Sequence, residues 1–201
     1  MPVKGELISA RGTAFEGTTY YFSDAYAPDF KGVSPNAKNV ADALRTANPS
    51  ARIVRKDFDA PILKQASDVS GFFHRGIYGY KDGRGVDGWN GDYAINGTII
   101  LSGKSGWWLA QSIESYNGLW MAAGHQGNFI KWFSANAYGG TNYSNTPAAA
   151  VTHVVEPTAA GANGPQLFLC WDSGKPFAYC AWKSVPGDFA LQAVGDPWVT
   201  R

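Results

Sequence analysis

Two carboxylic acids each follow an apolar stretch of this sequence. Glu114 closes the stretch 106–113, and Glu156 closes 148–155. Both stretches are typical of buried strands, and an open parallel sheet binds ligands beyond the carboxyl ends of its strands. Two acids brought together there acquire separated pKa values and can share acid–base work. The alternative is that each carboxylate caps a helix or fixes a turn.

Three further residues near these acids could take part in the same chemistry. His125, in the loop GHQGN, could act as a general base or a metal ligand, its loop could bind an anion through backbone N–H groups, or it could cap local backbone. His153 lies inside an apolar stretch, which favours a buried, hydrogen-bonded histidine, although Glu156 is near. Ser115 has no GxSxG sequence around it, which argues against a serine hydrolase.

The two acids would repel each other if their strands were neighbours. Adjacent parallel strands lie about 4.8 Å apart, so one carboxyl must be protonated or a donor must lie between them. His125 is the nearest donor in sequence to Glu114 and Glu156. We expect such a Glu–His–Glu group to be a lock on the fold rather than a catalytic site.

Metal and thiol chemistry have weaker support in the sequence. Asp82, Asp87 and Asp92 offer oxygen ligands of the kind that calcium prefers, but their spacing is not that of an EF-hand and Arg84 intrudes. A turn-rich connector is the favoured interpretation, and we expect no cofactor. The two cysteines, at positions 170 and 180, are expected to be buried free thiols, with a disulfide as the alternative.

The composition limits the class of protein. The 201 residues predict a single domain, 1–201, with 1–17 as a loosely defined entry segment. A net charge of +1 without clustered basic residues argues against a nucleic-acid surface, and no apolar run is long enough to span a membrane. No signal peptide is expected in this sequence. Many glycines and aromatics with few charges favour an extracellular or surface-associated protein, or one that packs against copies of itself.

Aromatic residues divide into expected core and expected surface. Trp132, Trp171 and Trp182 lie at helical spacing and are predicted to be core. Trp89 and Trp120 lie in predicted loops, where a ring could stack on a sugar or be buried at a protein interface.

Strand and helix signals alternate along the chain. Strands are predicted at 18–23, 51–56, 76–81, 98–102, 106–113, 148–155 and 191–194. Helices are predicted at 35–47, where Ser34 would cap, at 61–73 and at 128–137, with two short helices that Pro165 and Pro176 would open. This alternation predicts a three-layer α/β sandwich with a mainly parallel central sheet.

The order of short motifs adds a resemblance. FDAP (58–61), GYKDGRG (79–85), IESYNG (113–118), VVEP (154–157) and VGDP (194–197) follow one another. In this the chain resembles an uncharacterised, often exported bacterial family, and its VGDP ending is similar to the close of gingipain-type cysteine peptidases. The resemblance implies a caspase-like α/β fold.

The same resemblance implies that peptidase chemistry is missing. Caspase-like peptidases need a His-Gly after one central strand and a nucleophilic cysteine after the next. Here the position of that cysteine reads Ser112-Ile113-Glu114-Ser115, and no His-Gly occurs in the sequence. We therefore expect the fold without the cysteine-peptidase activity.

Two functions remain open from the sequence. The first is a non-catalytic domain for binding or assembly, with a protein partner, a second copy of the chain or a carbohydrate as its ligand. The second is a hydrolase with a site built from Glu114, His125, His153 and Glu156. The two differ in one geometric respect, because the hydrolase needs these four side chains to converge in an open cleft.

Overall fold

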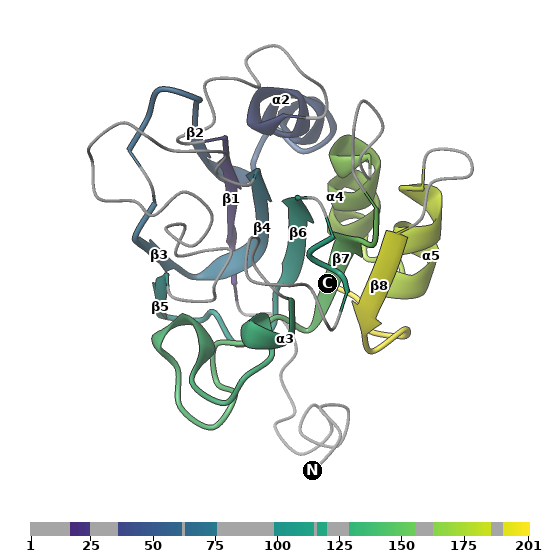
Figure 1. Cartoon of the computed structure of the whole chain (residues 1–201). Helices are drawn as coiled ribbons and strands as arrows, with labels where there is room; N and C mark the ends of the chain where they lie inside the picture. The colour runs from purple at the N-terminus through teal and green to yellow at the C-terminus, as the bar shows by residue number, and fades with distance from the viewer. Residues whose placement is uncertain are drawn as a thin grey trace.

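A six-stranded sheet organises the computed structural model. The structure describes residues 17–24, 36–61, 63–75, 99–114, 116–119, 129–155, 163–185 and 191–201. In these ranges the sheet order is β2-β1-β4-β6-β7-β8 (Figure 1). The strands are β1 (Thr19–Ser23), β2 (Arg52–Lys56), β4 (Val69–Arg75), β6 (Leu109–Ile113), β7 (Ala149–His153) and β8 (Leu191–Gly195).

The sheet is parallel except at one edge. The first five strands in this order pair in parallel, and β8 pairs antiparallel with β7. Two short strands, β3 (Gln65–Ser67) and β5 (Ile100–Ser102), form a separate parallel pair. The prediction of an α/β fold with a mainly parallel central sheet is confirmed.

Helices follow the strands at most of the expected places. They are α2 (Ala37–Ala47), α3 (Phe129–Trp132), α4 (Gly164–Asp172) and α5 (Phe177–Lys183), with a 3-10 turn η2 (Ala137–Gly139). The cap of α2 is Asn36 rather than Ser34, because the Asn36 side chain accepts a hydrogen bond from the N–H of Asn39 at 2.9 Å. Asn163 caps α4 in the same way.

The predicted helix at 61–73 is wrong, since this segment contains β3 and most of β4. Its apolar residues fall at spacings of four, three and four, which suggested one helix face. In the structure β4 lies between β1 and β6, and all seven of its residues are buried. A central strand covered on both faces is apolar without strict alternation, so its pattern can imitate a helix.

Two other predictions need adjustment, and a third is not tested. The strand at 98–102 exists as β5, but it belongs to the two-stranded sheet. The helix at 128–137 is shorter, because α3 ends at Trp132 and turns follow it. The predicted strand at 76–81 lies outside the described residues.

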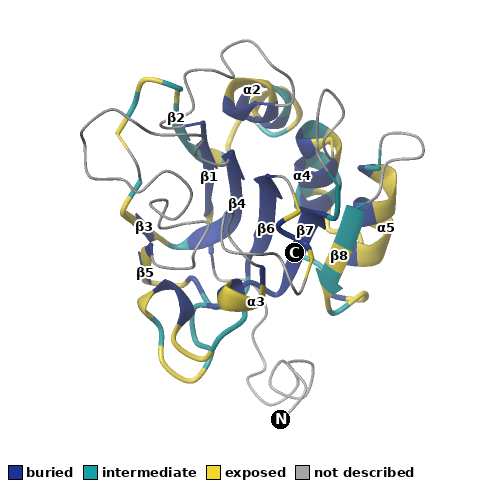
Figure 2. Ribbon diagram, viewed as in Figure 1, coloured by how far each residue is buried: buried dark blue, intermediate teal, exposed yellow. Residues whose placement is uncertain are grey.

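Two hydrophobic cores pack on opposite faces of the sheet. In β1, Tyr20 and Phe22 belong to the core that also includes side chains of α2, α4 and α5, whereas Tyr21 belongs to the core that includes Trp108 and Trp132. Figure 2 shows the central strands buried along their length. This alternation follows from the pleat of the strand.

The tryptophan predictions are confirmed in two cases and wrong in one. Trp132 and Trp171 are buried in the two cores. Trp182 is 72% exposed, because α5 turns Phe177, Cys180 and Ala181 toward the core and leaves Trp182 on its outer face. Trp89 and Trp120 lie outside the described residues.

A disulfide joins the neighbouring helices α4 and α5. Cys170 and Cys180 are bonded, with their Cα atoms 5.3 Å apart, so the expectation of free thiols is wrong. The turn at 173–176 reverses the chain and brings α5 back against α4, which places the two sulfur atoms within bonding distance. None of the helices in the described ranges combines the length and apolar character needed to cross a bilayer.

Candidate functional site

Buried polar side chains gather where the parallel strands end. We call this group the carboxyl-edge cluster: Asp24 after β1, His74 and Arg75 on β4, Ser112 and Glu114 at the end of β6, and Thr152 and His153 on β7, each at most 5% exposed. Parallel strands bring their carboxyl ends to one edge of the sheet, which is why residues far apart in sequence meet here. The pleat places Asp24, Arg75 and His153 toward α2 and α4, and His74, Ser112 and Glu114 toward the opposite face.

Asp24 connects β1, β4 and α2. Its carboxylate accepts a hydrogen bond from the first backbone N–H of α2, that of Ala37, at 2.7 Å, and lies 3.5 Å from Nε of Arg75. Burial raises the pKa of Asp24, while the Ala37 hydrogen bond and the Arg75 guanidinium act in the opposite direction. The carboxylate therefore anchors a helix N-terminus and balances a buried cation.

His153 is a fully buried histidine at the end of β7. Burial lowers its pKa to about 4, opposed by a hydrogen bond with the backbone of Ser112 and assisted by the positive charge of Arg75. Its backbone N–H donates to Oδ1 of Asn117 at 3.1 Å. The expectation of a buried, hydrogen-bonded histidine is confirmed, and the imidazole is neutral at pH 7.

Ser112 and Glu114 form a direct pair on the other face. The hydroxyl of Ser112 donates a hydrogen bond to Oε1 of Glu114, and His74 lies opposite Ser112 in the register of β4 and β6. These three side chains line a cavity of about 10 Å³, which is room for a single water molecule. Aromatic side chains form much of its wall: Phe72, Trp108, Trp132 and Tyr138. A substrate does not fit in this space.

The structure brings two of the predicted site residues to the same edge of the sheet. The strands that precede Glu114 and Glu156 are β6 and β7, which are adjacent and parallel, as the prediction of facing acids required. Glu114 and His153 both belong to the carboxyl-edge cluster, but their side chains lie on opposite faces of the sheet.

The other candidates, Ser115, His125, Glu156, Asp82, Asp87 and Asp92, lie outside the described residues, so the Glu–His–Glu group stays a prediction. Within the described ranges, no group of three or more His, Cys, Asp or Glu side chains is arranged to hold a metal ion.

Sequence reasoning missed the members of the cluster on β1 and β4. Asp24, His74 and Arg75 follow or close apolar strands, which is the same signal that identified Glu114. The signal was hidden at His74 because the preceding residues were interpreted as a helix. A polar pair directly after FF would have indicated a strand end.

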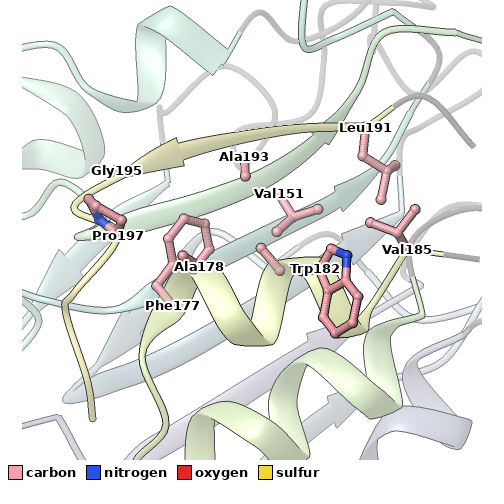
Figure 3. Close-up of a pocket in the computed structure, with 10 residues that line it drawn as sticks. Val151, Phe177, Ala178, Trp182, Val185, Leu191, Ala193, Gly195 and Pro197 are labelled. Carbon is pink, nitrogen blue, oxygen red and sulfur yellow. The ribbon is translucent and has the colours of Figure 1, made fainter.

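An open apolar groove lies along the β8 edge of the sheet, between α5 and β8. Its volume is about 290 Å³, and it is lined by Val151, Phe177, Ala178, Ala181, Trp182, Val185, Leu191, Ala193, Gly195 and Pro197. Figure 3 shows Trp182, Val185 and Leu191 at one end and Phe177, Gly195 and Pro197 at the other. None of these lining side chains is charged.

The segment after β8 fixes one end of this groove. The backbone N–H of Phe177 donates to the carbonyl of Val199 at 2.8 Å, and that of Ala178 donates to the carbonyl of Pro197 at 3.0 Å. These bonds satisfy N–H groups in the first turn of α5, which carry no partner within the helix. Trp198, which follows Pro197, is 79% exposed. Two large indole rings, Trp182 and Trp198, therefore lie on the surface of this region.

No protein-family model, curated protein or solved structure matches the chain.

Proposed function

We propose that this chain is a non-catalytic α/β domain for binding or assembly, and that its binding surface is the α5/β8 groove. The observation that carries the proposal is a contrast in exposure. Glu114 and His153 are at most 1% exposed, whereas Trp182 beside the groove is 72% exposed. A catalytic group must reach its substrate, and a binding surface must be open.

The chemistry of the groove favours a protein ligand over a carbohydrate. Sugar recognition requires polar groups beside the aromatic ring, because the hydroxyls of a sugar must be hydrogen-bonded when they leave water. The lining side chains offer none besides the indole N–H of Trp182. Aromatic anchors in apolar pockets are typical of protein interfaces.

We further propose an extracellular or surface location and a caspase/gingipain-like, three-layer arrangement. The disulfide between Cys170 and Cys180 supports the location, because disulfides persist in oxidising compartments. The mainly parallel sheet with a hydrophobic core on each face supports the fold. The VGDP motif supports it as well, since Val194 and Gly195 close the last strand.

Selection from a random displayed peptide library tests the binding function. The immobilised protein should enrich peptides with aromatic or aliphatic anchors, and Trp182→Ser should reduce their binding at least tenfold. The matched control is Ile130→Ser on α3, where an apolar side chain is 48% exposed away from the groove. Enriched peptides that bind Trp182→Ser as well as the unchanged protein would refute the groove as the binding surface.

The alternative function is a hydrolase with its site at the carboxyl-edge cluster. It is favoured by one observation, that Ser112, Glu114 and His74 line a common cavity, and it requires this cavity of about 10 Å³ to open before a substrate can enter. A screen of chromogenic acyl esters and peptides tests it, with Ser112→Ala and Glu114→Gln as variants. Turnover that survives purification and is lost in both variants, while their folded state is retained, would favour the hydrolase over the binding domain.

A further inference from the structure

Helix α5 depends on its neighbours for its stability. It has seven residues, of which Phe177, Cys180 and Ala181 are buried, and the rest of the helix faces solvent. An isolated helix shorter than about 12 residues is marginal in water even when its sequence favours helix. The segment 177–183 therefore keeps its helical form through the contacts that attach it to the rest of the fold.

Backbone hydrogen bonds hold both ends of α5. The N–H of Phe177 donates at 2.8 Å to the carbonyl of Val199 in the segment 196–201, which we call the strap. Beyond the other end, the carbonyl of Ser184 accepts the N–H of Asn163 at 2.8 Å. Val199 is 6% exposed and belongs to the same core as the buried side chains of α5. Helix α5 and the strap are therefore one unit, because each supports the other.

The disulfide attaches this unit to α4, which lies beside α5 (Figure 1) and is anchored more firmly. Four of the nine residues of α4 are buried. One of them is Trp171, whose indole N–H donates to the carbonyl of Ser70 on β4 at 3.2 Å. While the bond is intact, Cys180 cannot leave α4, because a disulfide keeps the two Cα atoms within about 7 Å of each other. The bond therefore prevents α5 from moving away as a whole.

A reductant with two thiols can break this bond at Cys170. Cys170 is half-buried and the turn 173–175 beyond it is exposed, whereas Cys180 is fully buried. A thiolate of the reductant attacks Sγ of Cys170, and the electron pair of the broken bond leaves on Sγ of Cys180. The second thiol of the reductant then displaces Cys170 from the mixed disulfide. The dithiol is thereby oxidised to a disulfide, and its two protons pass to the two cysteines.

The reduced protein can keep α5 docked. The carbonyl of Lys175 lies 3.7 Å from Sγ of Cys180, which suits a weak hydrogen bond from the reduced thiol. The buried side chains and the backbone bonds to the strap do not depend on the disulfide. Reduction therefore leaves the docked form as the major state and changes how often α5 opens.

We propose that the disulfide between Cys170 and Cys180 is a redox gate, whose reduction by a dithiol lets α5 and the strap open together while the sheet and α4 stay folded. The bond closes a loop of ten residues, so its loss should raise the population of the open form roughly a hundredfold. Phe177 and Trp182 line the groove (Figure 3), so opening also removes one of its walls. The inference goes beyond the proposed function and does not depend on what the groove binds.

The rate at which Cys180 is alkylated under native conditions tests the opening of α5. The variant Cys170→Ser breaks the bond and keeps the buried sulfur in place, so its single thiol reacts with iodoacetamide only when α5 opens. We expect a slow reaction whose rate rises little with urea, because local opening exposes little surface. A rate with the full urea dependence of global unfolding would overturn the inference, since complete unfolding alone would then expose Cys180.

Hydrogen exchange of the full chain compares the two redox states. Dithiothreitol should speed the exchange of the Phe177 and Ser184 amides roughly a hundredfold, with a smaller urea dependence than the amides of β4 show. Cys170→Ser is the control and should give the fast rates with or without dithiothreitol. Unchanged exchange in α5 after full reduction, or one urea dependence for α5 and β4, would overturn the gate. So would a bond that dithiothreitol reduces only after the chain has unfolded.

Discussion

The Ser112 hydroxyl donates its hydrogen bond to a Glu114 carboxylate in a place that water barely reaches, with both side chains 1% exposed. A buried carboxylate that loses a donor keeps its desolvation cost without compensation. We therefore expect the pair to act as a lock, that is, to stabilise the folded position of the chain where β6 ends.

We expect Glu114→Gln and Ser112→Ala each to lower the free energy of unfolding by about 1–3 kcal/mol. Because the two side chains act together, the double variant should cost less than the sum of the single changes. Urea unfolding measures all three. Ser134→Ala is the control, since Ser134 makes an exposed hydrogen bond to the carbonyl of Lys131 and should have little effect. Additive losses would contradict the lock.

Asp24→Asn should be among the most destabilising polar substitutions in the chain. The amide oxygen can still accept the N–H of Ala37, but the negative charge beside Arg75 is lost and a buried guanidinium remains. Breaking a buried ion pair from one side costs about 3–5 kcal/mol. The comparison is Asp42→Asn, which removes an exposed partner of Lys38 and should cost less than about 1 kcal/mol. Equal losses for the two variants in urea unfolding would contradict this prediction.

His153 should make the protein less stable in mild acid. Burial lowers its pKa from 6.5 to about 4, so between these values the unfolded chain binds a proton that the folded chain does not. The contribution of His153 to the free energy of unfolding is therefore fully present above pH 6.5. It is lost as the pH decreases, by up to about 3 kcal/mol near pH 4.

The raised pKa of Asp24 acts in the opposite sense, because it decreases stability as pH rises above 3.8. The measurement is therefore the difference between the unchanged protein and His153→Gln, followed by chemical unfolding from pH 4 to 8. Between pH 6.5 and 4, the free energy of unfolding of the variant should fall less steeply with decreasing pH than that of the unchanged protein. Identical pH profiles for the two proteins would show that His153 titrates alike in the folded and unfolded states, which would contradict the lowered pKa.

Reduction of the disulfide should destabilise the fold without changing its architecture. Cys170 and Cys180 are ten residues apart. Closing a loop of this length lowers the conformational entropy of the unfolded chain, which stabilises the folded state by about 3 kcal/mol. Thermal unfolding with and without reductant measures the loss. The control is the double variant with alanine at both positions, which should melt at one temperature in either buffer. Two thiols titrated in the denatured, unreduced protein would contradict the bond.

Local sequence determined the type of fold and most of its elements. The apolar runs that became β1, β6 and β7 are bounded by polar and turn-forming residues, so their existence and rough limits follow from short-range pattern. The same holds for α4, where Pro165 lies in the first turn. Their alternation led to the mainly parallel sheet, because right-handed crossovers are the usual solution for such an order.

Tertiary structure decided whether the β4 segment forms a helix or a strand, and which face of α5 packs against the sheet. The segment from Val69 to Phe73 fits both a helix face and a buried strand, and its position between two other strands selects the strand. The side chain of Trp182 is large and apolar, which suits a core, but the orientation of α5 turns it toward solvent. Sequence does not state which face of a short helix meets the sheet.

The candidate site depends most on this long-range order. Glu114 could be named from the end of its own strand, whereas His74 became its neighbour only when β4 and β6 paired in one register. The groove likewise exists because β8 runs antiparallel at the edge of the sheet and α5 packs beside it. Strand order and direction are set by the packing of the whole sheet, so local sequence predicted the residues that end each strand, and the tertiary structure decided which of them meet.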